Sequence, residues 1–246
     1  DMLVVEPTRK VIQDAFEEHI IHAPGMTKVR DLVKGPIIPT PGAVMEAAKV
    51  LKEDLGDLVI FDVGGATTVN LILISPEPEA KRTVEGDLGV FVNVNHVVEK
   101  IGIEELKKEF PDTDELLANY KPIPESDREK QFVERLTLEA VLTSLERHAG
   151  HIRYLYGANG KKKVAEGKDL TAVRYIIGTG GALTRLPNRV EILSKVRNYS
   201  KGLELFPNET AKVLIDEDYI LSSLGVLSKK YLEDALLLMK KSLRIL

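Results

Sequence analysis

The chain has 246 residues, of which 43% are hydrophobic and 29% charged, so it is long enough to bury a sizeable core and has an ordinary globular composition. Its formal net charge of −4 argues against a nucleic-acid-binding protein, which usually carries a basic excess. It contains no cysteine, which excludes disulfides and thiolate metal sites, and no apolar run approaches the roughly 18 residues of a membrane span. These features predict a cytoplasmic protein that has neither a nucleic acid nor a membrane as its partner.

The first 57 residues are helical in pattern. Apolar residues at helical spacing predict a helix over 6–22, and a proline-rich connector over 35–42 precedes a second predicted helix from Ala43 to Lys52. The chain begins at Asp1 rather than at a methionine, and the helical pattern starts almost at once. We therefore expect it to be the C-terminal portion of a longer protein.

Strand patterns begin at residue 58. The apolar run over 58–61 leads into a glycine turn, and the segments over 69–74 and 82–85 continue as predicted strands. This succession predicts antiparallel strands at the start of a sheet. Another strand is predicted over 172–177, and it too runs directly into glycines.

Helical patterns dominate the remainder of the chain. Residues 95–156 are predicted to be mostly helical, in three segments broken at Pro111 and at residues 121–124. Residues 157–168 are predicted to form a polar loop or hairpin, and residues 216–246 are rich in helix formers and leucine. Strands followed by helices and then by a strand, glycines and a helix indicate an α/β fold with a helical insertion.

A first candidate site is the segment Asp62-Val63-Gly64-Gly65-Ala66-Thr67-Thr68. Glycines accept the unusual backbone angles of a tight turn and let backbone amides approach a phosphate. Asp62, at the end of the strand, can hold Mg²⁺ through water, and the Thr67 hydroxyl can donate to a phosphate oxygen. The alternative interpretation is a plain hairpin turn with a capping aspartate.

A second candidate site is Gly178-Thr179-Gly180-Gly181, where a strand is followed by a helix. Such a junction offers backbone amides to a nucleotide. It is not a dinucleotide-binding fingerprint, because the third glycine and the acidic ribose partner are not at the required offsets. The alternative interpretation is close packing of the strand against the helix.

Taken together, the two segments resemble the actin/Hsp70/sugar-kinase superfamily of ATPases. In that superfamily a first phosphate loop, a connecting helix, a second phosphate loop of this glycine type, an adenosine loop and a second connecting helix follow in order. Residues 39–48 resemble the first connecting helix, and residues 216–227 resemble the second. The resemblance implies an actin-like, ribonuclease H-like ATPase lobe, with 58–94 and 171–246 as its ATPase subdomain, 95–170 as an inserted and mainly helical subdomain, and 1–57 as a helical connector to a missing lobe.

Three motifs resemble those of the glutamate-mutase-associated MutL (GlmL) family. They are DVGGATT at 62–68, RTVEGDLG at 82–89 and GTGGALTRLP at 178–187. The family implies an ATP-dependent chaperone or reactivating factor for an adenosylcobalamin-dependent mutase or aminomutase. It also implies the site residues. Asp62 would hold Mg²⁺ and serve catalysis, while the remaining positions would bind ATP, namely Gly64, Gly65 and Thr67 at the phosphates and Gly178, Gly180 and Gly181 at the adenosine.

Two departures from this family pattern bear on activity. Val69 stands where the family usually has an aspartate, and the first phosphate loop would lie upstream of residue 1. We therefore expect ATPase activity only in the longer protein and none in this chain alone. A small-molecule kinase of the same superfamily and a scaffold without turnover remain the alternative functions.

Two further assignments complete the prediction. Glu85 ends a predicted strand, and it or Asp87 could lie near the glycine turn, where a carboxylate would suit general-base catalysis, although a solvated turn cap is an equal alternative. Partner contact is assigned to the helical segment over 95–156, whose mixed charges are also typical of a solvated surface.

Overall fold

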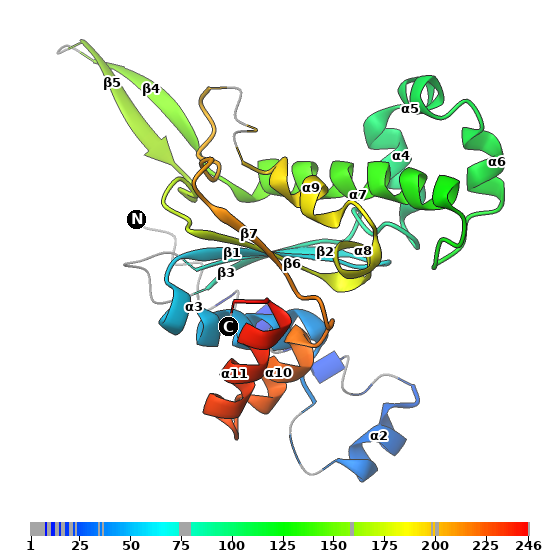
Figure 1. Cartoon of the computed structure of the whole chain (residues 1–246). Coiled ribbons are helices and arrows are strands. Elements are labelled where there is room, and N and C mark those ends of the chain that lie inside the picture. The colour runs from blue at the N-terminus through cyan, green and yellow to red at the C-terminus, as the bar shows by residue number, and fades with distance from the viewer. Residues whose placement is uncertain are drawn as a thin grey trace.

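The computed structural model describes residues 24–33, 35, 37–73, 80–157, 160–197, 199 and 202–245, together with residues 8, 11, 12, 15, 18, 19 and 22. The helix predicted over 6–22 lies largely outside the described residues. Figure 1 shows a central sheet with helices on both of its faces and a separate two-stranded hairpin.

The central sheet has the order β3-β2-β1-β6-β7. β2 is antiparallel to both of its neighbours, whereas β6 and β7 run parallel to β1. A sheet in this order, with only its second strand reversed, is the topology expected of a ribonuclease H-like fold, so the predicted fold class is confirmed. The strands are β1 (Leu58–Val63), β2 (Thr68–Leu73), β3 (Lys81–Glu85), β6 (Tyr175–Thr179) and β7 (Lys212–Ile215).

The helices and the separate hairpin account for the other regular elements of the described residues. No helix in this part of the chain combines the length and the apolar character that crossing a bilayer requires. The elements are α2 (Met26–Leu32), α3 (Thr40–Leu55), α4 (Val94–Ile101), α5 (Ile103–Glu109), α6 (Thr113–Ala118), α7 (Asp127–His148), β4 (His151–Gly157), β5 (Gly160–Glu166), α8 (Gly180–Arg185), α9 (Arg189–Ser194), α10 (Leu221–Leu227) and α11 (Leu232–Ser242).

Both faces of the sheet are buried at β1 and β2, and most residues of these two strands are apolar. Alternate residues of β1 point to opposite sides. Phe61 and Val63 belong to the core that includes residues of α7, α8 and α9, whereas Leu58 and Ile60 belong to the core shared with α3, α10 and α11. α3 is therefore a layer of this domain, packed through Ala47 and its neighbours, rather than only a connector to another lobe.

α7 joins the sheet to a third core formed with α4, α5 and α6. Its start is fixed by a capping box, in which the Ser126 hydroxyl accepts from the Glu129 amide and the Glu129 carboxylate accepts from the Ser126 amide. Phe132, near this start, packs edge-to-face on Phe110 at 5.4 Å between ring centroids. Farther along, Val141 and its neighbours pack on the sheet. One helix thus contributes to two cores, while the predicted domain boundaries remain a prediction.

Two details of the predicted elements were wrong. The helical prediction extended to residue 156, but residues 151–157 form strand β4 because they pair in register with 160–166. The short strand β7 was not predicted from the sequence. It completes the sheet edge beyond β6 and carries Asp216 immediately after its last residue.

Candidate nucleotide site

The two glycine segments meet at one end of the sheet. Asp62 and Thr179 are register partners on the neighbouring parallel strands β1 and β6. A side chain on Gly180 would lie 2.5 Å from the Asp62 Oδ1 atom and 2.6 Å from the Val63 amide nitrogen. The two segments therefore lie side by side at this end of the sheet, and their sharing of one ligand site stays a prediction.

The three glycines of the second segment have different physical roles. A Cβ on Gly178 would contact core side chains, with Leu193 at 2.9 Å, so packing explains this glycine. Gly180 has φ of 86° and allows α8 to approach β1 closely. Gly181 has open space where its Cβ would be. Of the three, Gly181 alone presents an open side, where a ligand could approach.

The first glycine segment is held by the residues that follow β3. Val90 and Phe91 donate their amides to the carbonyl oxygens of Gly64 and Gly65, at 3.1 and 2.9 Å. Gly64 and Gly65 do not have positive φ, so the expectation that they serve unusual backbone angles was wrong. They are small because neighbouring atoms are close: a Cβ would be 3.2 Å from the Thr67 carbonyl oxygen and 3.3 Å from the Phe91 Cβ, respectively.

This arrangement leaves backbone donors available. Within the described part of the chain, the amides of Gly65, Ala66 and Thr67 donate to no other backbone group. Gly65 and Ala66 are exposed and Thr67 is partly exposed. Consecutive free amides at a glycine turn are the donors that a phosphate binds.

Asp62 is the buried acid between the two segments. Asp62 is only 9% exposed. No hydrogen bond from the described residues stabilises its ionised carboxylate. Burial, with a smaller contribution from the nearby Asp216, raises the pKa of Asp62 from 3.8 to about 6. A buried carboxylate without a partner fits a hydrated divalent cation, which would supply the missing positive charge.

Asp216 has the opposite character, because its carboxylate is fully satisfied. It accepts hydrogen bonds from the hydroxyls of Thr179 and Ser242 at 2.9 and 2.6 Å, and from the amides of Ile220 and Leu221 at 3.2 and 2.9 Å. This completely buried side chain ties β6, the start of α10 and the end of α11 together. Asp216 therefore supports the site rather than offering a free ligand.

Tyr219 is a site residue that the sequence reasoning missed. It has φ of 54°, a conformation that non-glycine residues rarely adopt and that often marks functional sites. The Gly181 backbone lies beside its hydroxyl, and the Arg185 guanidinium is 6.0 Å from its ring centroid. Burial, with the Asp62 and Asp216 charges, raises the pKa of the Tyr219 phenol. No sequence pattern indicates a positive φ at a tyrosine.

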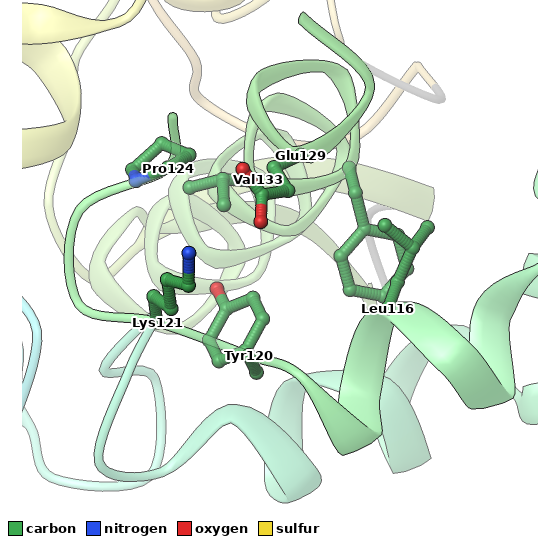
Figure 2. Close-up of a pocket in the computed structure, with 7 residues that line it drawn as sticks. Leu116, Tyr120, Lys121, Pro124, Glu129 and Val133 are labelled. Carbon is green, nitrogen blue, oxygen red and sulfur yellow. The ribbon is translucent and has the colours of Figure 1, made fainter. Parts of the chain in front are cut away.

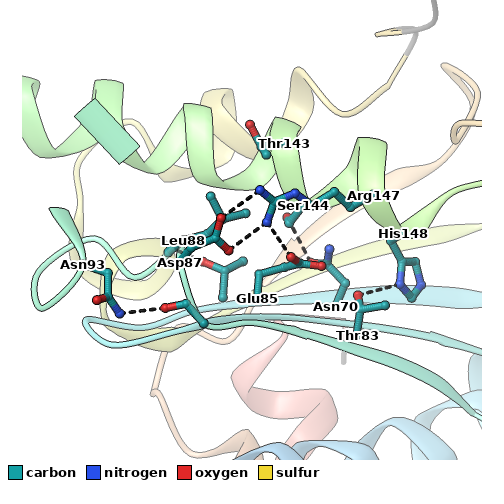
Figure 3. A network of polar contacts seen from close by, with 12 residues as sticks. Asn70, Thr83, Glu85, Asp87, Leu88, Asn93, Thr143, Ser144, Arg147 and His148 are labelled. Carbon is teal, nitrogen blue, oxygen red and sulfur yellow. Dashed lines mark hydrogen bonds and ion pairs between the residues drawn. The ribbon is translucent and has the colours of Figure 1, made fainter. Parts of the chain in front are cut away.

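Glu85 lies on the other face of the sheet from Asp62, so its assignment as a catalytic base stays a prediction that this arrangement does not support. Register pairs Asp62 with Val69, which faces α3, whereas Glu85 pairs with Thr68 on the opposite face. Figure 3 shows the Glu85 carboxylate beneath α7, where Arg147 donates to it at 2.6 Å and to Asp87 at 2.8 Å. A carboxylate neutralised in this way on the other side of the sheet serves structure.

Two cavities of the described residues lie away from the glycine segments. The pocket in Figure 2 has a volume of about 10 Å³, room for roughly one water, between Tyr120, Lys121 and α7. A second cavity of about 270 Å³ lies near Tyr175 and Lys212, the first residues of β6 and β7, at the opposite end of the sheet. The described residues also contain no cluster of three or more metal-ligating side chains.

The fold and the paired glycine segments define an actin-like α/β domain. The chain belongs to the MutL protein family, whose model matches residues 1–243. Protein MutL of Clostridium tetanomorphum is 36% identical over 269 aligned residues, which cover 98% of this chain and 58% of that protein. The chain therefore spans little more than half the length of this relative.

Two solved structures are similar to this chain at lower sequence identity. The ethanolamine utilization protein EutJ from Carboxydothermus hydrogenoformans is 18% identical with a TM-score of 0.38, over 75% of this chain and 52% of that one. A chain of the PilM-PilN type IV pilus biogenesis complex is 17% identical with a TM-score of 0.30, over 83% of this chain and 51% of that one.

Proposed function

We propose that this chain supplies half of a Mg²⁺–ATP site and that the longer protein is a cytoplasmic chaperone or reactivating factor for an adenosylcobalamin-dependent mutase. Membership of the MutL family supports the association with such a mutase. The single observation that carries the nucleotide site is the buried, unbonded Asp62 carboxylate between two glycine segments.

Each part of the ligand has residues suited to it. Asp62 would hold a hydrated Mg²⁺, and the free amides of Gly65, Ala66 and Thr67 would bind phosphate oxygens. The open side of Gly181 would accept the adenosine. Bound Mg²⁺–ATP would supply the binding free energy that favours one arrangement of the two lobes over another.

The chaperone role follows from such a change of arrangement. Cobalamin-dependent enzymes perform radical chemistry, and a damaged cofactor has to leave before a fresh one binds. A protein whose lobes change their angle with the nucleotide binds one conformation of its partner better, and so shifts the partner's population. We propose that the conformation favoured is an open mutase, from which damaged cobalamin dissociates.

Calorimetry on the longer protein tests the nucleotide site. Mg²⁺–ATP should bind the wild type, Asp62→Ala should lose the Mg²⁺-dependent part of the affinity, and Gly181→Val should block the adenosine side by bulk. Gly86→Ala, at a glycine with open space around it, is the matched control and should bind normally. Unchanged affinity in both site variants would place the nucleotide elsewhere. Submicromolar affinity for ATP in the present chain alone would show that the second lobe is not needed.

The chaperone role has its own assay. A mutase inactivated with a damaged cofactor is mixed with the longer protein, Mg²⁺–ATP and fresh adenosylcobalamin. Recovery of activity that depends on ATP supports the proposal. No recovery, together with no complex in a pull-down, contradicts it.

A scaffold without ATP turnover is the second candidate, and Val69 favours it. Val69 is 2% exposed, pairs directly with Asp62 and belongs to the core against α3. An apolar residue thus occupies the position beside the candidate Mg²⁺ carboxylate. ATP binding without measurable hydrolysis in the longer protein would establish the scaffold function.

A further inference from the structure

The β4–β5 hairpin is the most exposed regular element of the described residues. It consists of 151–157 and 160–166, which pair antiparallel, and we refer to it as the arm. Figure 1 shows that the arm extends away from the sheet and its helices. No residue of either strand is buried. Seven residues per strand give it a length of about 20 Å.

The root of the arm is firmly held. The Gly150 amide donates to the Lys168 carbonyl at 2.6 Å, and the Leu205 amide donates to the Gly150 carbonyl at 2.9 Å. Gly167 has φ of 89°, and a Cβ there would be 2.8 Å from the Gly150 α-carbon. An isolated two-stranded hairpin is marginally stable in water, so this close-packed root fixes the direction in which the arm projects.

Both faces of the arm carry apolar and cationic side chains together. The register places Tyr154 opposite Lys163 and Tyr156 opposite Lys161 on one face. Leu155 pairs with Lys162 on the other face. Tyr156 is 78% and Leu155 46% exposed, so hydrophobic side chains face solvent on both sides of the arm.

The three consecutive lysines of the arm are available to a partner. The arm carries Arg153, Lys161, Lys162, Lys163 and Glu166, a net +3 in a chain whose total is −4. Within the described residues, the three consecutive lysines form no salt bridge, whereas Arg153 pairs with Glu166 at 3.3 Å. The Lys161 Nζ atom instead lies over the ring of Tyr154, 3.7 Å from its centroid.

The helical segment from α4 to α7, residues 94–148, differs on this point. Its cations are largely paired within the segment itself, for example Lys107 with Asp114 at 2.8 Å and Lys108 with Glu105 at 2.6 Å. Charges that already pair with a neighbour on the same surface are less available to a partner than the unpaired lysines of the arm. The observations therefore favour the arm over the helical segment as a partner-binding surface.

We propose that the arm docks into an acidic groove on the mutase partner, an inference that rests on the function proposed above. Its unpaired lysines complement carboxylates. Its apolar side chains on both faces require a partner that encloses the arm, as a groove in a protein does. A nucleic acid stacked on the tyrosine face would leave Leu155 in water and would meet a chain of negative net charge.

The test uses the longer protein and purified adenosylcobalamin-dependent mutase. The triple variant Lys161→Glu, Lys162→Glu, Lys163→Glu should weaken the complex roughly tenfold or more and abolish its salt dependence. The matched control reverses three lysines of the helical segment, Lys100, Lys108 and Lys121, which changes the net charge by the same amount. The control should bind the mutase as the wild type does.

A photo-crosslinking residue at Tyr156 adds a direct readout and should join the mutase, whereas the same residue at Ile123, which is 75% exposed, should not. If the wild type binds the mutase and the arm variant binds equally well, the arm proposal is overturned and the proposed function stands. If the wild type forms no complex, both are overturned. Tighter binding of a single-stranded 20-mer oligonucleotide than of the mutase, or crosslinks from Tyr156 to a second copy of the protein, would also overturn the proposal.

Discussion

Gly225 in α10 lies against the backbone carbonyl of Ala43 in α3, with no room for a side chain between them. A Cβ on Gly225 would also be 2.9 Å from the amide nitrogen of Ala47, one turn farther along α3. The two helices that resemble the connecting helices of actin-like ATPases therefore pack directly on each other through their smallest residues. This contact holds α10 against α3, the helix that precedes the first strand of the sheet.

Replacement of Gly225 by alanine should destabilise the fold. The added methyl group would overlap backbone atoms of α3, which cannot rotate away as a side chain does, so α10 would have to shift. Overpacking of this kind costs about 1–3 kcal/mol. Urea unfolding of the chain should show this loss, while Gly86→Ala, which has open space around it, should change the stability by less than about 0.5 kcal/mol. Equal stability of the two variants would mean that α3 and α10 do not pack closely in solution.

The glycines of this chain show what sequence reasoning predicts well and what it does not. The positions of the glycine segments, the strands before them and their meeting at one site were predicted, because apolar runs that end in glycines are local signals. The reason for each glycine was not. Gly64 and Gly65 have ordinary φ, Gly178 packs in the core, and Gly225 serves a helix crossing. These reasons depend on contacts with residues distant in sequence.

Asp62→Asn should stabilise the chain at neutral pH. The folded pKa of about 6 lies above the unfolded value of 3.8, so between these values the folded state binds more protons and stability falls as the pH rises. Above pH 6 the ionised carboxylate costs at most about 3 kcal/mol, which the neutral amide avoids. Urea unfolding at pH 7.5 should show a gain of about 1–3 kcal/mol, and unfolding at pH 4 should show almost none. An equal gain at both pH values would assign the effect to packing instead of charge.

His148 should produce the opposite pH dependence. Figure 3 shows it against Thr83, whose hydroxyl oxygen is 2.9 Å from the His148 Nδ1 atom. Burial, with the charges of Lys168 and Lys81, lowers the pKa of His148 from 6.5 to about 3. The unfolded chain therefore binds more protons in this window, and stability is lost as the pH falls below 6.5.

His148→Gln removes this titration and should reduce the loss of stability between pH 6.5 and 4.5 by about 2–3 kcal/mol. The measurement is urea unfolding of both proteins at the two pH values. His96→Gln is the matched control, because it replaces an exposed histidine in place of the buried one. If the wild type and His148→Gln lose the same stability on acidification, then the imidazole is not buried as the structure has it.

The placement of Glu85 on the face opposite Asp62 has a physical cause. From the sequence, Asp62 and Glu85 each lie near the end of a strand, and nothing local indicates which face either side chain occupies. The faces depend on the register of β1 with β2 and of β2 with β3, and a shift of one residue reverses them. Tyr219 was missed for a related reason, since its position beside Gly181 depends on the loop between β7 and α10.

Glu85→Gln should therefore affect the stability of the fold slightly and the binding of Mg²⁺–ATP hardly at all. In the longer protein it should leave the Mg²⁺–ATP affinity within about twofold of the wild type, because Glu85 faces α7 and Asp62 faces α3. The stability cost should be below about 1 kcal/mol, since Arg147 is 39% exposed and keeps its two hydrogen bonds to Asp87. Calorimetry and urea unfolding measure the two effects. A tenfold loss of ATP affinity with unchanged stability would return Glu85 to the nucleotide site and show that the register of β3 differs from the one described.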